Sequence, residues 1–79
     1  MTTYEFWREI ASGDVWAVEL KDGVVVGSRG PLHWSEIHPS FLESGYEYDA
    51  DEARLVDARR AEFEPLDERS VIMLAGSVE

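Results

Sequence analysis

The chain has 79 residues, with 17 acidic and seven basic side chains and a net charge of −10. This excess of negative charge opposes binding to nucleic acid and to anionic membranes, and it favours basic partners. The absence of cysteine excludes disulfides, thiolate metal sites and thiol nucleophiles. We therefore expect a single domain, residues 1–79, whose stability depends on an apolar core rich in aromatic side chains.

The N-terminal sequence Met1–Glu5 contains no basic region followed by an apolar run, so it does not resemble a signal peptide. No stretch of the chain approaches the ~20 apolar residues that a membrane-spanning helix needs. From these two features we expect a soluble protein of the cytoplasm.

Residues 3–10 fit two structures. As a strand, the segment would place Phe6 and Ile10 on one face. A three-residue loop would then set Phe6 beside Leu20, and it would set Ile10 beside Trp16. As a helix, the segment would begin with a capping box and end at a glycine. We favour the strand, because aromatic side chains suit a sheet and the segment is short for a helix.

The clearest pattern is a β-hairpin over residues 15–28. Apolar side chains alternate with polar or small ones up to residue 21, and three consecutive valines restart the chain after residue 23. Between them, Asp22-Gly23 tolerates the positive φ angles of a type I′ turn. The register that follows pairs Lys21 with Val24, Leu20 with Val25, and Val18 with Gly27. The face that this register buries carries Trp16, Val18, Leu20 and Val25.

Between residues 27 and 48, turn-forming residues predict only short elements. Ser35 could cap one turn, and Pro39 could open a second one that Gly45 would end. We expect a brief extended piece at residues 46–48.

A helix is predicted over about residues 50–64. Asp49 as the N-cap begins a capping-box pattern, and no glycine or proline follows until Pro65. At 100° per residue, one side of this helix is apolar. That side carries Ala53, Leu55, Val56 and Phe63.

Residues 70–75 form a short apolar run of strand length, which we expect to pair with the hairpin. The chain contains no internal repeat and no linker. The order of elements predicts an α+β fold, in which a small antiparallel sheet of the 15–28 hairpin and flanking strands packs against one main helix.

Both histidines lie in residues 33–38, together with Glu36. Their spacing, H-x-x-E-x-H, differs from the helical zinc motifs, and on a helix the two rings would lie about 140° apart. The serines lack a nucleophile motif, and the chain is short for building a water-excluding pocket. We therefore expect no metal, no cofactor and no enzymatic activity.

Acidic residues concentrate between residues 43 and 68, where ten acids and three arginines leave −7 of the net charge. A rigid array of carboxylates offers a partner's arginines and lysines the charges that they normally find on phosphates. Such an array also needs apolar anchors, and two tyrosines within the run are candidates. The predicted partner-binding residues are Glu43, Tyr46, Glu47, Tyr48, Asp49, Asp51, Asp57, Glu62, Glu64, Asp67 and Glu68.

Some of these acids have an alternative role. For Asp49, capping of the predicted helix is at least as good an explanation as partner binding. For Asp51, Asp57, Glu62 and Glu64, the sequence indicates no capping or core role. Those four side chains are either solvated or in contact with a partner.

In size, charge, aromatic content and this acidic run, the chain resembles the small, acidic, cysteine-free phage proteins that inhibit nucleic-acid-binding machinery, namely DNA mimics and the more acidic anti-CRISPR proteins. Those proteins share no diagnostic motif, so the resemblance transfers no residue role. It implies an inhibitor in the cytoplasm of a bacterial host cell. Such an inhibitor would occupy the basic DNA-recognition surface of a CRISPR effector complex or a similar nucleic-acid-binding protein.

The alternative function is a general protein–protein interaction module or a small homo-oligomer, in which the acidity serves only solubility. A face bearing Trp7, Trp16 or Trp34 would then form the contact. Salt distinguishes the two functions, because added salt weakens binding between opposite charges and barely changes an apolar interface.

Overall fold

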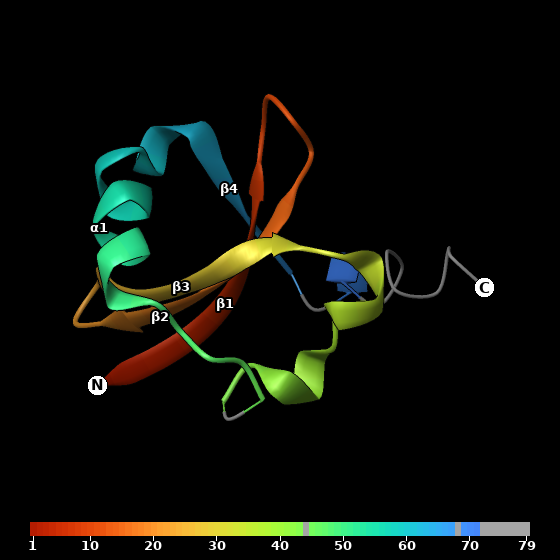
Figure 1. The fold of residues 1–79 in the computed structure, drawn as a ribbon, viewed down its shortest axis with the longest axis horizontal. Helices are drawn as coiled ribbons and strands as arrows, with labels where there is room; N and C mark the ends of the chain where they lie inside the picture. The colour runs from red at the N-terminus through yellow and green to blue at the C-terminus, as the bar shows by residue number, and fades with distance from the viewer. Residues whose placement is uncertain (44, 68, 72–79) are drawn as a thin grey trace.

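A computed structural model describes residues 1–43, 45–67 and 69–71 of the chain. Four strands form one antiparallel sheet in the order β3-β2-β1-β4, and α1 packs against it, so the predicted α+β class is confirmed (Figure 1). The strands are β1 (Thr2–Glu9), β2 (Val15–Lys21), β3 (Val24–Leu32) and β4 (Phe63–Leu66). The helices are α1 (Ala50–Ala58) and the 3₁₀ turns η1 (Trp34–Glu36), η2 (Pro39–Phe41) and η3 (Arg60–Glu62).

The sheet is covered on both faces. The helix-side core lies between the sheet and α1, and it contains Trp7, Val18, Leu20, Val25, Ala53, Val56 and Phe63. The loop-side core lies on the other face, and it contains Phe6, Val15, Ala17, Leu32, Ile37 and Val71. Neighbouring side chains of a strand point to opposite faces, so Phe6 and Trp7 are both buried, one in each core.

Residues 3–9 lie in a strand, as favoured, but the predicted pairing of β1 with β2 is wrong. Trp7 lies opposite Trp16, and Phe6 lies opposite Ala17. Ile10 is outside the strand and mostly exposed. The connection between the strands is longer than the three residues assumed, because β1 ends at Glu9, and each added residue shifts the register.

The hairpin of β2 and β3 turns where the sequence predicted. Asp22 and Gly23 have φ angles of 52° and 82°, as a type I′ turn requires. The predicted pairs next to the turn are confirmed, but Val18 lies opposite Ser28 and not Gly27. Val26 is an extra residue in β3, and this β-bulge shifts the register beyond it. The predicted buried face is confirmed.

Residues 33–49 cross from β3 to α1 over the loop-side core. Pro39 opens η2 as predicted, and Gly45 donates its N–H to the Phe41 carbonyl (2.8 Å). The expected cap at Ser35 is wrong, because the first turn begins one residue earlier, at Trp34. Residues 46–48 form no strand, although Asp49 next to them makes an isolated bridge with β3.

Asp49 caps α1 as predicted, but the predicted helix end at residue 64 is wrong. The α-helix stops at Ala58, and Phe63–Leu66 form β4, which pairs with β1. In this position Phe63 enters the helix-side core from a strand. Leu55, predicted for the apolar side of the helix, is 66% exposed. Long-range pairing therefore overrides the local helical pattern.

The strand predicted at residues 70–75 lies mostly outside the described residues. Its described part, residues 70 and 71, is helical together with residue 69, which contradicts the strand. Val71 is buried in the loop-side core.

Candidate acidic interface

Three of the predicted binding acids hold backbone N–H groups of the fold. Asp49 Oδ1 accepts hydrogen bonds from two N–H groups in the first turn of α1 (2.8 and 2.9 Å). Asp57 Oδ1 accepts one from Val25 N–H in β3 (3.3 Å). Asp67 Oδ1 accepts one from Ser70 N–H (2.7 Å), and this bond lowers the pKa of the Asp67 carboxyl. These carboxylates have structural roles before any partner arrives.

Two further acids form ion pairs with arginines. The Arg59 guanidinium lies 2.9 Å from Glu62 and 2.6 Å from Glu9, and its hydrogen bonds lower the pKa of the Glu62 carboxyl. Glu64 pairs with Arg8 across β4 and β1. The fold therefore compensates this part of the acidic run internally.

The other predicted binding acids are uncompensated where the structure describes them. Glu43, Glu47 and Asp51 are exposed and make no ion pair with a described cation. Glu68 lies outside the described residues. The predicted single acidic array is thus divided into acids that the fold uses and acids that remain available.

The two predicted tyrosine anchors are half-buried beside the loop-side core. Tyr46 donates its hydroxyl to the Glu36 carbonyl, and Tyr48 donates its hydroxyl to the Leu42 carbonyl (2.5 Å). Burial raises the pKa of both phenols. Both rings therefore fasten the 33–49 connection to the sheet, and a partner would meet only their remaining exposed parts.

Two residues that the sequence analysis did not single out join this region. The ring of Tyr4 in β1 lies 5.7 Å from the ring of Tyr48, centroid to centroid. A hydrogen bond with Glu19 raises the pKa of Tyr4, and the negative charge of Glu43 raises it further. We define the acidic tyrosine surface as Tyr4, Glu19, Glu43, Glu47 and Tyr48.

Gly27 shows how closely this surface is assembled. It lies opposite Glu19 in the hairpin. A Cβ atom on Gly27 would lie 2.7 Å from Tyr48 Cβ and 2.9 Å from Glu19 Oε1. The missing side chain therefore lets Glu19 and Tyr48 come together over β3. The alternation of residues 15–21 already places Glu19 on the face opposite Trp16, and this was the available signal.

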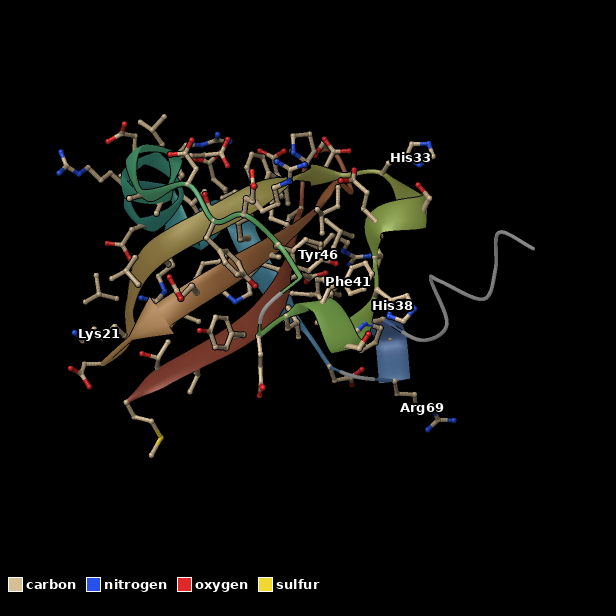
Figure 2. All side chains as sticks on the ribbon, turned by 60° about the horizontal axis from the view of Figure 1, so that its bottom comes forward. Lys21, His33, His38, Phe41, Tyr46 and Arg69 are labelled. Carbon is tan, nitrogen blue, oxygen red and sulfur yellow. The ribbon has the colours of Figure 1, made fainter. Side chains whose placement is uncertain are left out.

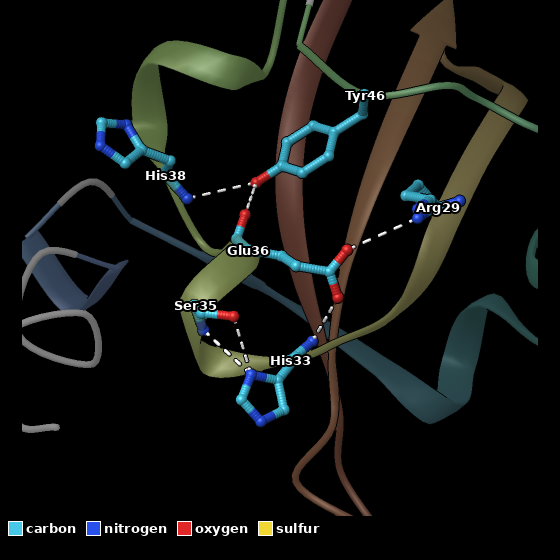
Figure 3. A network of polar contacts seen from close by, with 6 residues as sticks. All are labelled: Arg29, His33, Ser35, Glu36, His38 and Tyr46. Carbon is cyan, nitrogen blue, oxygen red and sulfur yellow. Dashed lines mark hydrogen bonds and ion pairs between the residues drawn. The ribbon is translucent and has the colours of Figure 1, made fainter.

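Glu36 lies at the centre of a polar network beside this surface (Figure 3). Its carboxylate accepts a hydrogen bond from His33 N–H (3.0 Å) and lies 3.5 Å from the Arg29 guanidinium. The hydrogen bond from His33, together with Arg29, lowers the pKa of the Glu36 carboxyl. Tyr46 hydroxyl accepts a hydrogen bond from His38 N–H (3.2 Å). The network ties η1 to β3 and to the 45–47 segment.

The histidines make local contacts. His33 Nδ1 lies 2.9 Å from Ser35 Oγ, and His38 Nδ1 lies 2.7 Å from Ser40 Oγ. The His38 ring stacks on Phe41 with centroids 4.7 Å apart. In the described ranges, no three His, Asp or Glu side chains gather as a metal ligand set.

Two hollows open beside the acidic tyrosine surface, with volumes of about 370 and 390 Å³. Arg29 and Glu47 line both of them, so the hollows adjoin each other. The first also contains Phe41, which lies beside Tyr46 in Figure 2 with ring centroids 5.8 Å apart. The second also contains Asp49 and carries more polar atoms.

No family model, curated protein or solved structure matches this chain. Among the described residues, no helix has the length and the apolar character that a membrane span requires.

Proposed function

We propose that this protein is a non-enzymatic acidic inhibitor that binds the basic nucleic-acid-recognition surface of a bacterial protein complex and blocks its binding to DNA. In this role it acts like a DNA mimic or an anti-CRISPR protein. Its carboxylates occupy arginines and lysines that otherwise hold phosphates, and the association gains from electrostatic steering and from the release of counterions.

The observation that carries the proposal is the acidic tyrosine surface. Glu19, Glu43 and Glu47 make no ion pair with any described cation, whereas acids elsewhere pair with arginines. Half-buried tyrosine rings lie among them. Charged groups at an interface mainly set the association rate and its salt dependence, while partly buried aromatic rings supply affinity. This surface combines both kinds of group.

The alternative tryptophan interface has less support. Trp7 is 4% exposed, and the Arg60 guanidinium covers its ring at 5.2 Å from the centroid. Trp16 is half-buried and packs against the helix-side core. An interface through Trp7 would require the core to open, and Trp16 offers a partner only the part of its ring that the core leaves exposed.

The test begins with capture of binding proteins from a bacterial lysate at low salt, followed by elution with duplex DNA. The eluted protein is then purified, and its DNA binding is titrated with the acidic protein. We expect DNA binding to disappear at a stoichiometric ratio. We also expect the affinity between the two proteins to fall at least about tenfold between 50 and 200 mM salt, as for binding through several charge contacts.

A charge-reversed variant locates the contact. Glu47→Lys should strongly weaken inhibition, whereas Asp14→Lys changes the net charge equally at another exposed place and should retain most of it. The proposal is wrong if the first variant inhibits as well as the unmodified protein. It is equally wrong if the partner binds independently of both salt and DNA.

A further inference from the structure

The smaller of the two hollows has the lining of a side-chain pocket. Its volume of about 370 Å³ lies near the lower end of ligand pockets, which suits one long side chain. Carboxylates, an aromatic ring and a guanidinium line it together, which distinguishes it from a patch of acids. The lining residues that bear on its chemistry are Arg29, Glu36, Phe41, Tyr46 and Glu47.

The aromatic wall is open to an incoming group. Phe41 is 41% exposed, although its ring is braced by His38 on one side and Tyr46 on another. A partly exposed ring that lies between two neighbouring rings is suited to stacking with a planar cation. Glu47, which also lines the hollow, is exposed and makes no ion pair with a described cation.

One arginine of the protein already lines this hollow. Arg29 Nη2 lies 3.5 Å from Glu36 Oε2, which is long for a charged hydrogen bond, and the Arg29 side chain is 48% exposed. The contact shows that the Glu36 carboxylate in the wall of the hollow pairs with a guanidinium, and its length indicates that Arg29 is held loosely. An incoming cation of the same kind would compete with it.

We propose that this hollow receives one arginine side chain of the partner, and that Arg29 is its intramolecular competitor. This inference rests on the proposed function, since it names the group through which the basic partner is anchored. The guanidinium would stack on Phe41 and pair with Glu47 and Glu36. Arginine fits better than lysine, because its planar group stacks on rings and binds carboxylates through two donors.

The test uses N-acetyl-arginine amide as the probe and follows the full chain by NMR. We expect chemical-shift changes at residues that line the hollow, and much weaker effects from N-acetyl-citrulline amide, which has nearly the same shape without the charge. Glu47→Gln and Phe41→Leu should each weaken probe binding about two- to fivefold, as expected for one exposed charge or cation–π contact. Arg29→Ala should strengthen it.

Each variant has a matched control. Asp14→Asn removes one exposed carboxylate elsewhere, Leu55→Ala trims an exposed apolar side chain on α1, and Arg54→Ala removes one positive charge from α1. None of the three should change probe binding by the amount seen for its counterpart. The spectra also report whether each variant is folded.

Equal effects from the pocket variants and their controls would contradict the proposed arginine pocket. Stronger binding of N-acetyl-lysine amide than of N-acetyl-arginine amide would also contradict it. Either result leaves the proposed function to its own test, because inhibition through the wider acidic tyrosine surface does not need a pocket. Conversely, the protein could bind the probe specifically and yet fail the DNA-competition test. That result would support the arginine pocket and contradict the proposed inhibitor function.

Discussion

Asp49 shows how one acidic residue serves the fold in two ways. Its carboxylate caps α1, and its backbone exchanges hydrogen bonds with Ser28 at the edge of β3 (2.8 and 3.1 Å). The residue therefore joins the helix to the sheet. Its negative charge also lies at the positive end of the helix dipole. The predicted partner-binding role is additional to these contacts, and a substitution must separate the two.

Asp49→Ala should lower the free energy of unfolding by about 1 kcal/mol, because two N–H groups of α1 lose their acceptor. Asp49→Asn retains a good N-cap and removes the charge, so it should lose much less stability. Urea denaturation of both variants measures the difference. If both lose the same amount, the charge of Asp49 and not its hydrogen bonds stabilises the helix. Weaker partner binding by Asp49→Asn, which retains the cap, would assign this charge to the interface.

At the scale of elements, β4 completes the sheet and the helix-side core. Its pairing with β1 brings Phe63 between Trp7 and Trp16, with ring centroids 6.2 and 6.1 Å apart. Within β4, Pro65 has no N–H to offer another strand, and Phe63 donates its own N–H to Arg60 in η3. A proline on an edge strand hinders the addition of further strands.

The opposite edge of the sheet is also partly covered. In β3, Val25 N–H is held by Asp57, and Ser28 is paired with Asp49. These contacts occupy groups that would otherwise be open to another strand. For this reason the proposed partner binding uses side chains on the sheet face and not extension of the sheet.

Phe63→Ala should destabilise the protein by about 3–5 kcal/mol, the usual effect of removing a large buried ring. Leu55→Ala, which truncates an apolar side chain on α1, should cost less than about 0.5 kcal/mol because that side chain is exposed. Chemical denaturation of both variants compares them directly. A helix extending to residue 64 with both side chains on its buried side would make both substitutions costly, so a large effect of Leu55→Ala contradicts the fold.

At the scale of the whole molecule, arginines join segments that are distant in the sequence. Arg59 pairs with Glu9, which lies 50 residues away, and Arg8 pairs with Glu64, 56 residues away. The uncompensated acids lie elsewhere. Lys21 and Arg69, which form no ion pair within the described residues, lie at opposite ends of the molecule (Figure 2). Some acids therefore form ion pairs that hold the fold together, and others are available to a partner.

The acids that form these ion pairs should make the stability of the protein sensitive to acid. Hydrogen bonds from Ser12 and Arg59 lower the pKa of Glu9, and those from Arg59 lower that of Glu62. Below their ordinary pKa of 4.5 the unfolded chain binds more protons than the folded one, so the free energy of unfolding falls as pH decreases. Urea midpoints measured from pH 6 to pH 3 should show this decrease. Glu62→Gln should give a shallower slope, and an unchanged slope would contradict the role of the pair.

The buried phenols should produce a second decrease at alkaline pH. The pKa values of Tyr46 and Tyr48 are raised by burial from the ordinary value of 10.0. Above pH 10 the folded protein therefore retains protons that the unfolded chain loses, and the free energy of unfolding falls as pH rises. Absorbance of the phenolate, followed together with unfolding, measures this effect. Tyr48→Phe should reduce it, whereas full ionisation of the folded protein near pH 10 would contradict it.

The sequence by itself determined the features that depend on a few neighbouring residues. The Asp22-Gly23 turn, the alternating strand before it and the Asp49 cap each follow from backbone preferences and hydrogen bonds within one turn or hairpin. The α+β class followed from the order of these elements. The concentration of acids was also visible, because charge is a property of composition.

Only the tertiary structure decided which of those acids are available. Arginines compensate Glu62 and Glu64, whereas no described cation pairs with Glu43 or Glu47, and Glu19 joins the latter two from β2. The same is true of the strand at residues 63–66, which a local helical pattern concealed. These features depend on contacts between segments up to 56 residues apart. The local periodicity of the sequence does not indicate such contacts, because they form only when the sheet assembles.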